Sequence, residues 1–301
     1  MPEDSRGITA CCRVAPGCHN AVAMSDLLQQ RFPDIPWAAF LLLHQDLPRE
    51  GPGSDEATSR AIRQLPPLPP APVVYDLGCG PGRQTLVLAR TLRSSIIALD
   101  LVQQFLDTLS RRAAEQGLSD LVVPRCADMA QLEAEPGSID LIWTEGSIYF
   151  VGFARALELW RPLLAPGGCV VASHATWLTD DPPDDARQIF EQELPDMTDV
   201  EGNRRLAAGA GYATIDSFVL PPSAWWDEYY TPMLQRIELL RPLAAGEAGG
   251  LPGSAGRARE TNTAGDAKLA AVLTEAEAEI DLFRRCGSSY SYVFYVMQKA
   301  P

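Results

Sequence analysis

Three glycines at two-residue spacing follow a short apolar segment, and they mark the stretch of this chain most suited to chemistry. Residues 73–77 read Val-Val-Tyr-Asp-Leu, which is typical of a buried strand, and Gly78, Gly80 and Gly82 come directly after it. Pro81 has a fixed φ that suits the beginning of a helix. A turn with so few side chains lets a ligand lie against the main chain, where the N–H groups of a helix N-terminus face it. The stretch predicts a polar ligand, although glycine turns also join strands to helices where no ligand binds.

The spacing of the glycines separates two classes of ligand. The dinucleotide fingerprint Gly-x-Gly-x-x-Gly needs a glycine three positions after Gly80, where this chain has Arg83. Glycines at 78, 80 and 82 behind an acidic residue resemble instead motif I of the class I S-adenosylmethionine-dependent methyltransferases. The resemblance implies S-adenosyl-L-methionine as the cofactor. The motif I residues that it places at the cofactor are Asp76, Gly78, Gly80, Gly82 and Gln84.

Carboxylates follow the next two predicted strands. Asp100 ends the second strand, beside the glycine loop, where the hydroxyls of a ribose would lie. It could equally serve only as the N-cap of the following helix. Asp128 follows the third strand, where the resemblance implies a contact with the adenine amino group and the residues alone indicate a loop or a cap. The side chains that the resemblance implies on either side of the adenine ring are Leu101 and Met129.

Glu145 and His174 are the candidate catalytic residues. Each lies at the carboxyl end of a predicted parallel strand, where ligands bind in open α/β sheets, so we expect them to lie close together. An amine or alcohol acceptor would need such a base, and His44 is a third candidate. Glu145 could instead cap a helix or contact the cofactor, and a lone histidine at a strand end is often structural. The resembled subgroup has an acidic residue at the position of His174, so no particular substrate is transferred from it.

The segment Gly51-Pro52-Gly53-Ser54 precedes motif I. Its spacing alone predicts a loop between two helices, with Ser54 or Asp55 as a helix N-cap. A subgroup of small-molecule methyltransferases carries a similar Gly-Pro-Gly-Ser segment. That resemblance implies that amino-terminal helices fold over the cofactor and that Gly53 and Ser54 touch its methionine end.

The elements that position these residues predict an α/β fold. We expect a Rossmann-like sheet of seven strands, mostly parallel with an antiparallel last strand, helices on both faces and a helical lid. The predicted strands span residues 73–77, 95–99, 121–125, 138–144, 169–175, 212–220 and 290–297. The predicted segments are a disordered extension (1–23), a helical cap with a proline-rich connector (24–72), the cofactor-binding core (73–220), a helical lid insertion (221–289) with a mobile linker (246–265), and the last core strand (290–301).

Two further segments carry expectations. The acidic residues 180–201 predict a solvated helical excursion with Ile189 and Phe190 pointing inward. Aromatic residues open the lid insertion, and they could form core against the sheet or wall an apolar or cationic acceptor pocket. We favour core for the first tryptophan and pocket for one of the tyrosines. These aromatic residues are Trp225, Trp226, Tyr229 and Tyr230.

Composition excludes several classes of function. The 301 residues carry a net charge of −14, so a folded surface would repel phosphate backbones and anionic lipid, which argues against nucleic-acid and membrane partners. The longest apolar run, residues 37–43, is too short to span a bilayer, and no secretory leader opens the chain, so we expect a cytoplasmic protein.

The seven cysteines lack a disulfide framework. A metal cluster of Cys11, Cys12, Cys18 and His19 would lack paired ligands at zinc spacing, so no metal is predicted.

These observations together predict a transferase that uses S-adenosylmethionine to methylate a small-molecule acceptor by in-line displacement. Two alternatives stay open. The protein could be a non-methylating user of the same cofactor, such as an aminopropyl transferase or a cyclase, or a catalytically silent scaffold that keeps the cofactor pocket. The pattern assigns no acceptor and no oligomeric state.

Overall fold

The computed structural model describes residue 30, residues 32–246 and residues 263–301. The predicted extension (1–23) and nearly all of the predicted linker (246–265) lie outside the described residues. Within the described ranges, no helix combines the length and the apolar character that crossing a membrane requires.

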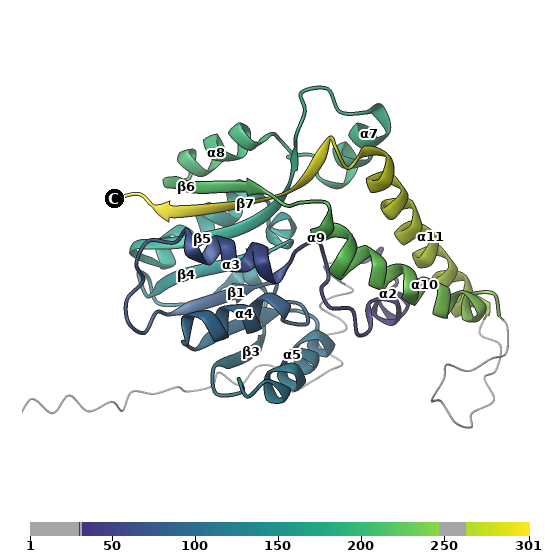
Figure 1. Cartoon of the computed structure of the whole chain (residues 1–301), viewed down its shortest axis with the longest axis horizontal. Coiled ribbons are helices and arrows are strands. Elements are labelled where there is room, and N and C mark those ends of the chain that lie inside the picture. Colours follow the sequence, from purple (N-terminus) through teal and green to yellow (C-terminus); the bar gives the residue numbers. More distant parts are fainter. Residues whose placement is uncertain (1–29, 31, 247–262) are drawn as a thin grey trace, which may run out of the picture.

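A seven-stranded sheet forms the centre of the described structure, in the order β3-β2-β1-β4-β5-β7-β6 (Figure 1). The strands are β1 (Val74–Leu77), β2 (Ile96–Asp100), β3 (Val122–Cys126), β4 (Ile139–Glu145), β5 (Leu164–Trp177), β6 (Tyr212–Val219) and β7 (Tyr290–Lys299). Strands β1 to β5 pair in parallel, whereas β7 runs antiparallel to both β5 and β6. The predicted fold class is confirmed.

Strand β1 lies where the chain order of the sheet reverses, between β2 and β4. Ligands of open α/β sheets bind beyond the carboxyl ends of the strands at such a switch point. All four residues of β1 are buried, including the charged Asp76, because helices cover the strand on both faces. The sheet therefore places the glycine turn at its ligand-binding edge.

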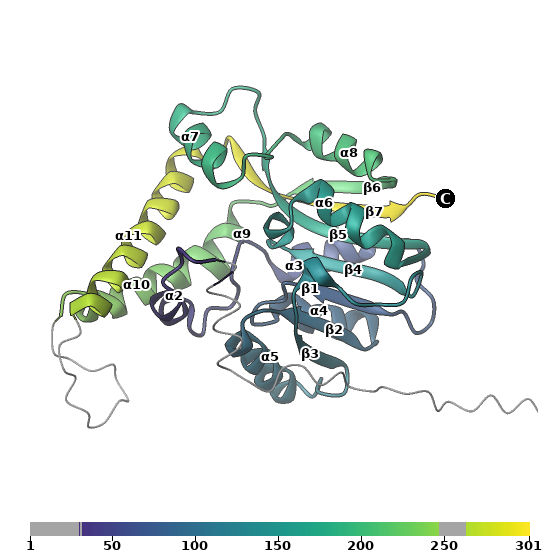
Figure 2. The same ribbon diagram turned by 180° about the vertical axis from the view of Figure 1, so that it is seen from behind.

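Helices cover both faces of the sheet (Figures 1 and 2). One face packs against α3, α4 and α5, and the other against α6 and α8. The helices are α2 (Trp37–His44), α3 (Asp55–Arg63), α4 (Arg83–Leu92), α5 (Gln103–Glu115), α6 (Phe153–Trp160), α7 (Asp184–Glu193), α8 (Val200–Gly209), α9 (Ser223–Trp225), α10 (Thr231–Ala244) and α11 (Thr263–Cys286). A π-helical turn, η4 (Trp226–Tyr230), joins α9 to α10.

The segment between β6 and β7, here called the helical insertion (residues 221–246 and 263–289), has a core of its own. Its helices α10 and α11 pack with α2 beyond the carboxyl ends of the parallel strands (Figure 1). Trp225 is buried and stacks on Phe283 with ring centroids 4.2 Å apart, as expected for a core residue. The insertion and α2 therefore form a second layer over the edge where the glycine turn lies.

Two local predictions need correction. Strand β5 begins at Leu164 rather than at Cys169, because Leu164 pairs with Ile139 before a register irregularity absorbs the predicted turn. Ile189 does not point inward but is 36% exposed. The inner face of α7 is formed by Ala186 and Phe190, which are four residues apart, and Ile189 lies about 100° away from Phe190 around the helix.

Candidate functional site

The turn after β1 has backbone conformations that only glycine adopts easily. The φ angles of Gly78, Gly80 and Gly82 are +68°, +54° and +84°, all in the left-handed region. A Cβ atom at Gly78 would clash with the side chain of Ser147, and one at Gly82 with Leu109. The turn therefore needs glycine for both conformation and space, and it presents main chain at the edge of the sheet.

Two carboxylates lie at the base of this glycine loop, and of these Asp76 is fully buried and Asp100 is half-buried. Asp100 accepts hydrogen bonds from the N–H groups of Gly80 and Val102, each 2.8 Å long, and burial raises its pKa to about 6. Asp76 accepts a hydrogen bond of 2.5 Å from the hydroxyl of Thr85, and burial raises its pKa to about 7. The other oxygen of Asp76, Oδ1, is buried and has no partner among the described residues. Both carboxylates lie where the sequence predicts them; that they bind a ligand stays a prediction.

The remaining predicted cofactor residues of this region surround the same loop. The Gln84 amide donates to the carbonyl of Cys79 at 3.0 Å, so it shapes the loop from within the protein. Asp128 accepts from the N–H of Ala130 at 2.8 Å, which makes it the cap of the short helix η1 (Met129–Gln131). The sulfur of Met129 lies 3.8 Å from the point where a Cβ at Gly78 would be. Met129 and the half-buried Leu101 therefore stay candidates for contact with a flat ring.

A segment from the amino-terminal half, residues 47–54, crosses over the glycine loop and is here called the strap. A Cβ at Gly80 would lie 3.2 Å from Cγ of Glu50. Arg112 of α5 donates to the carbonyls of Leu47 and Pro48 and to that of Pro81 in the loop, which ties the strap to the loop. Residues that precede motif I in the sequence therefore cover the loop with both main chain and side chains.

The two predicted residues of the strap have separate contacts. The N–H of Gly53 donates to the carbonyl of Ala224 in α9 at 3.0 Å, which joins the strap to the helical insertion. The hydroxyl of Ser54 accepts from the N–H of Ala57 at 3.1 Å, so Ser54 is the N-cap of α3. Neither contact reveals a ligand, and their predicted role at the methionine end of a cofactor stays a prediction.

Arg49 forms the densest group of charges over the loop. Its guanidinium is 4% exposed and bonds to Glu228 at 2.7 Å, and to Glu145 and Asp55 at 3.1 Å each. Arg83 bonds to two of the same carboxylates, those of Asp55 and Glu228. We call these five residues the Arg49 cluster. It connects the strap, α3, the start of α4, the end of β4 and the helical insertion.

Glu145 lies at the end of β4 as predicted, but its carboxylate is fully engaged. Besides Arg49, it accepts from the hydroxyl of Thr58 at 2.7 Å and from the indole N–H of Trp143 at 2.8 Å. Burial raises its pKa, and these three donors oppose that rise. A general base needs an oxygen free to receive a proton from the substrate. The geometry therefore favours a positioning role for Glu145.

His174 does not lie beside Glu145, in contrast to our expectation. Glu145 pairs with Ser173 in the parallel register, and side chains alternate between faces along a strand, so His174 points to the opposite face. There it is 3% exposed and stacks on Phe153, with ring centroids 5.2 Å apart. Burial lowers its pKa to about 4. The geometry does not support its predicted catalytic role, which stays untested.

The third predicted base, His44, lies beside the strap. Its Nδ1 is 2.5 Å from the Glu50 carboxylate, and its ring stacks on Phe40. The second oxygen of Glu50, Oε1, is buried without a partner among the described residues, and burial raises the pKa of this carboxyl. A carboxylate that accepts from one ring nitrogen fixes the tautomer of a histidine and leaves the other nitrogen as a proton acceptor. This pair has the arrangement of an oriented base next to the glycine loop.

Comparisons with known proteins agree with this geometry. A family model described as "Methyltransferase domain" matches residues 74–168. The dimethylglycine N-methyltransferase of Parasynechococcus marenigrum is 30% identical over 119 residues, 39% of this chain and 42% of that protein. The trans-aconitate 2-methyltransferase of Azoarcus sp. is 30% identical over 192 residues, 62% of this chain and 67% of that protein. The chain belongs to the class I S-adenosylmethionine-dependent methyltransferases.

A solved structure shows the same fold. The S-adenosylmethionine-dependent methyltransferase of Geobacter sulfurreducens, crystallised with S-adenosyl-L-homocysteine, has a TM-score of 0.68 and 20% identity, covering 88% of this chain and 98% of that one. The chain spans less than half the length of the first two curated relatives that it matches, 44% and 42%.

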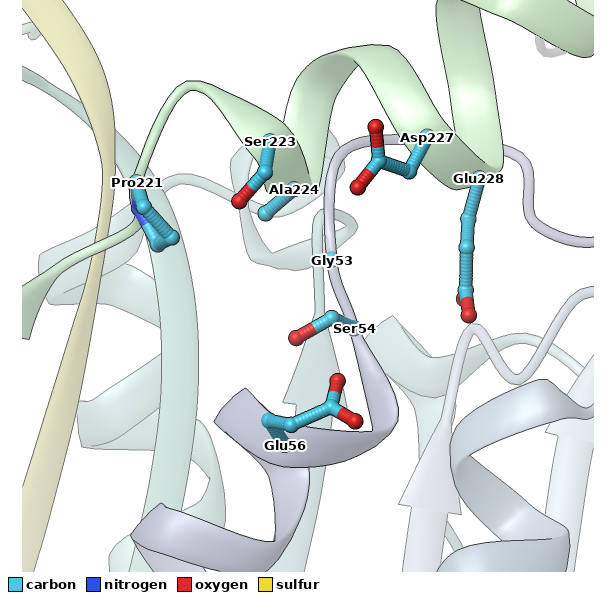
Figure 3. A pocket seen from close by; sticks show the side chains of 8 residues that line it. All are labelled: Gly53, Ser54, Glu56, Pro221, Ser223, Ala224, Asp227 and Glu228. Atoms are coloured by element: carbon cyan, nitrogen blue, oxygen red, sulfur yellow. The ribbon is translucent and has the colours of Figure 1, made fainter.

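A pocket opens between the N-terminus of α3 and the helical insertion (Figure 3). Its lining residues are Gly53, Ser54, Glu56, Pro221, Ser223, Ala224, Asp227 and Glu228. Glu228 belongs also to the Arg49 cluster, so the pocket borders that cluster on the side of α9. Three carboxylates and no basic side chain line it, which makes it an acidic opening next to the strap.

Sequence reasoning missed the residues that join the strap to the rest of the site. Arg49, Glu50 and Glu228 received no role, although the first two directly precede the Gly-Pro-Gly turn. Two adjacent residues of opposite charge directly before a turn that is predicted to cover a ligand are the sequence signal that could have identified Arg49 and Glu50. Nothing local distinguishes Glu228 from the many other acidic residues of the chain.

Proposed function

We propose that this methyltransferase binds S-adenosylmethionine on the glycine loop and transfers its methyl group to a small-molecule acceptor. The observation that carries the proposal is the loop itself: three left-handed glycines at the switch point of the sheet, with Asp100 at the tip of the neighbouring strand. The unpartnered, buried Oδ1 of Asp76 also fits a ligand with a donor group beneath the loop.

In this proposal the two halves of the nucleoside have separate partners. Asp100 receives the ribose hydroxyls, because each carboxylate oxygen has a second lone pair beyond its present backbone bond. Asp128, Leu101 and Met129 receive the adenine ring. The methionine end lies toward Gly53, where the strap passes Glu145 and the helical insertion.

The bound cofactor supplies an electrophilic methyl carbon on a sulfonium. The chain itself contributes alignment, which can supply about 7–11 kcal/mol in well-oriented systems. His44, oriented by Glu50, takes a proton from an acceptor that must lose one, and Glu145 holds Arg49 and thereby the strap. The net charge of −14 disfavours a nucleic acid as the acceptor and supports a small molecule.

Titration with S-adenosylhomocysteine tests the cofactor site. Gly78→Ala should weaken binding by about 100-fold or more, because the new Cβ displaces Ser147 and the left-handed conformation becomes strained. Gly117→Ala is the matched control, because Gly117 has φ +67° but nothing within 4 Å of a new Cβ. The control should bind like the parent protein. Unchanged affinity in Gly78→Ala would refute the site.

Transfer of a labelled methyl group from the cofactor to extracted metabolites tests the activity. Labelled product supports methyl transfer. Tight cofactor binding without labelled product from any extract would favour the alternatives, a non-methylating enzyme or a silent scaffold.

A further inference from the structure

The side chain of Glu50 lies between a histidine and the glycine loop. Its Oε2 is 2.5 Å from Nδ1 of the buried His44. Its Cγ is 3.2 Å from the point where a Cβ at Gly80 would lie, so the side chain covers the bare face of that glycine. Arg112 holds the strap there by donating to strap carbonyls and to the carbonyl of Pro81 in the loop. Printed contacts on both sides therefore place Glu50 against the loop.

The second carboxylate oxygen of Glu50, Oε1, is a buried acceptor that accepts nothing. It has no hydrogen-bond partner among the described residues. Protonation would not remove this deficit, because a proton on Oε1 would in turn need an acceptor. Most buried polar groups in proteins are paired, so the unpaired oxygen indicates a partner that the described chain does not supply.

Two neighbouring arginines leave Oε1 unpaired. Arg112 lies close enough for its charge to act on Glu50, but its guanidinium donates to three main-chain carbonyls. Arg49 directly precedes Glu50 in the sequence, but its guanidinium is bonded to the three carboxylates of the Arg49 cluster. The missing partner of Oε1 is therefore more consistent with a ligand on the loop than with these side chains.

Gly80 touches a second carboxylate as well. Its N–H donates to Oδ2 of Asp100 at 2.8 Å, while the side chain of Glu50 lies against its bare face. The charge of Glu50 contributes to the raised pKa of Asp100, as expected for two carboxylates that lie near each other. Two hydroxyl groups on neighbouring carbons offer one donor to each of two such carboxylates. A ribose has this pair of hydroxyls.

We propose that Glu50 is a ribose-binding residue of the cofactor site: its Oε1 accepts a hydrogen bond from one ribose hydroxyl of S-adenosylmethionine and leaves the other hydroxyl to Asp100. The inference rests on the proposed function and adds a residue of the strap to its cofactor site. Oε2 of Glu50 stays with His44, so one carboxylate joins the cofactor to the candidate base.

A simpler role for Glu50 would be to orient His44 and nothing more. That role needs only Oε2, and it leaves the buried Oε1 without a function. It also predicts that Glu50 is indifferent to the hydroxyls of a bound nucleoside. The two roles therefore differ in a property of the ligand that calorimetry can measure.

Three ligands test the ribose contact by isothermal calorimetry: S-adenosylhomocysteine and its 2′-deoxy and 3′-deoxy analogues. The parent protein should bind each analogue about tenfold or more weakly than S-adenosylhomocysteine, because each analogue lacks one hydrogen bond to a charged group. Glu50→Gln should bind S-adenosylhomocysteine about fivefold or more weakly. It should also discriminate against one of the two analogues by only about threefold or less, while its discrimination against the other stays as in the parent.

Three outcomes of this experiment would overturn the inference. The first is a parent protein that does not discriminate against either analogue. The second is a Glu50→Gln variant that discriminates against both analogues as the parent does. The third is a loss of discrimination against both analogues, because it would show general damage to the ribose site rather than one missing contact.

Two control variants separate the contact from indirect effects. Asp46→Asn removes the same charge four residues earlier, from a side chain that is 65% exposed and lies outside the strap, and it should keep all three affinities. His44→Phe removes the partner of Oε2 but keeps a ring that can stack on Phe40, and it should keep the discrimination against both analogues. If His44→Phe loses the same discrimination as Glu50→Gln, Glu50 acts through His44 and the inference is wrong.

The same titrations distinguish failure of the inference from failure of the proposed function. If S-adenosylhomocysteine does not bind the parent protein, the proposed function is wrong. If it binds and Glu50→Gln discriminates like the parent, the proposed function stands and only the inference is overturned. Circular dichroism checks that the variants fold. Should Glu50→Gln not fold, Glu50→Asp takes its place, because it keeps the charge but withdraws the carboxylate by one methylene, and it should show the same selective loss.

Discussion

The glycine loop and the Arg49 cluster face each other across the same site, and they are built in different ways. The loop comes from one continuous stretch, β1 to the start of α5, and holds its shape with main-chain geometry and short-range carboxylate contacts. The Arg49 cluster joins residues of the strap, α3, α4, β4 and the helical insertion through ion pairs around the buried Arg49. Chain continuity makes the first region a fixed surface, whereas the second exists only after the whole domain has folded.

This difference has an energetic consequence. A glycine in the left-handed region allows a backbone conformation that other residues adopt only with strain. Replacing it therefore disturbs the structure only near that residue. A buried charge depends on its partners, because removing one partner leaves the others desolvated and unpaired. The Arg49 cluster should therefore respond more strongly to a single substitution than the loop does.

The largest expected effect is that of Arg49→Ala. It should lower the free energy of unfolding by about 3–5 kcal/mol, because Glu145, 5% exposed, loses its cationic partner. Arg83→Ala is the matched control: Arg83 bonds to Asp55 and Glu228 as well but is 40% exposed, so the loss should be about 0–1 kcal/mol. Urea denaturation followed by circular dichroism measures both. Equal losses would show that burial of the cluster does not set its energy.

The two regions also differ in how far the sequence predicts them. The strand, the glycine spacing and Asp100 lie within thirty residues, so local patterns place them at one edge of the sheet. Arg49 and Glu228 are 179 residues apart, and no local pattern brings them together. The fold class and the glycine loop were therefore predictable from the sequence, and the Arg49 cluster was not.

The candidate bases show a second limit. Glu145 ends β4, and His174 directly follows the last residue of β5 that pairs with β4, although β5 itself continues to Trp177. Which face each side chain takes depends on strand register, and a shift of one residue reverses it. Because Glu145 pairs with Ser173, the side chain of His174 lies on the opposite face of the sheet, where it stacks on Phe153.

An intermediate effect is expected from the charge of Asp100. Its pKa in the folded protein is raised to about 6, so the carboxylate is ionised above that pH and increasingly protonated below it. Ribose hydroxyls donate to the ionised form, so affinity for S-adenosylhomocysteine should be constant above about pH 7 and fall up to about tenfold per pH unit below about pH 6. Isothermal calorimetry at a series of pH values measures this.

Asp100→Asn provides the control for that profile. It should bind about 10- to 100-fold more weakly at pH 7.5, because a hydrogen bond to a charged group contributes about 1.5–3 kcal/mol. It should also lose the fall in affinity below about pH 6 that the parent protein shows. If the variant keeps the pH profile of the parent protein, Asp100 does not contact the ligand.

The smallest expected effect belongs to Ser54, at the boundary between the two regions. Its hydroxyl caps α3, so Ser54→Ala should lower the free energy of unfolding by about 1 kcal/mol. Asp199→Ala removes the equivalent cap of α8, remote from the glycine loop, and should cost a similar amount. If Ser54 also contacts the methionine end of the cofactor, only Ser54→Ala will weaken S-adenosylhomocysteine binding. Equal affinity in both variants would assign Ser54 to the helix alone and leave Gly53 as the strap's contact with the ligand.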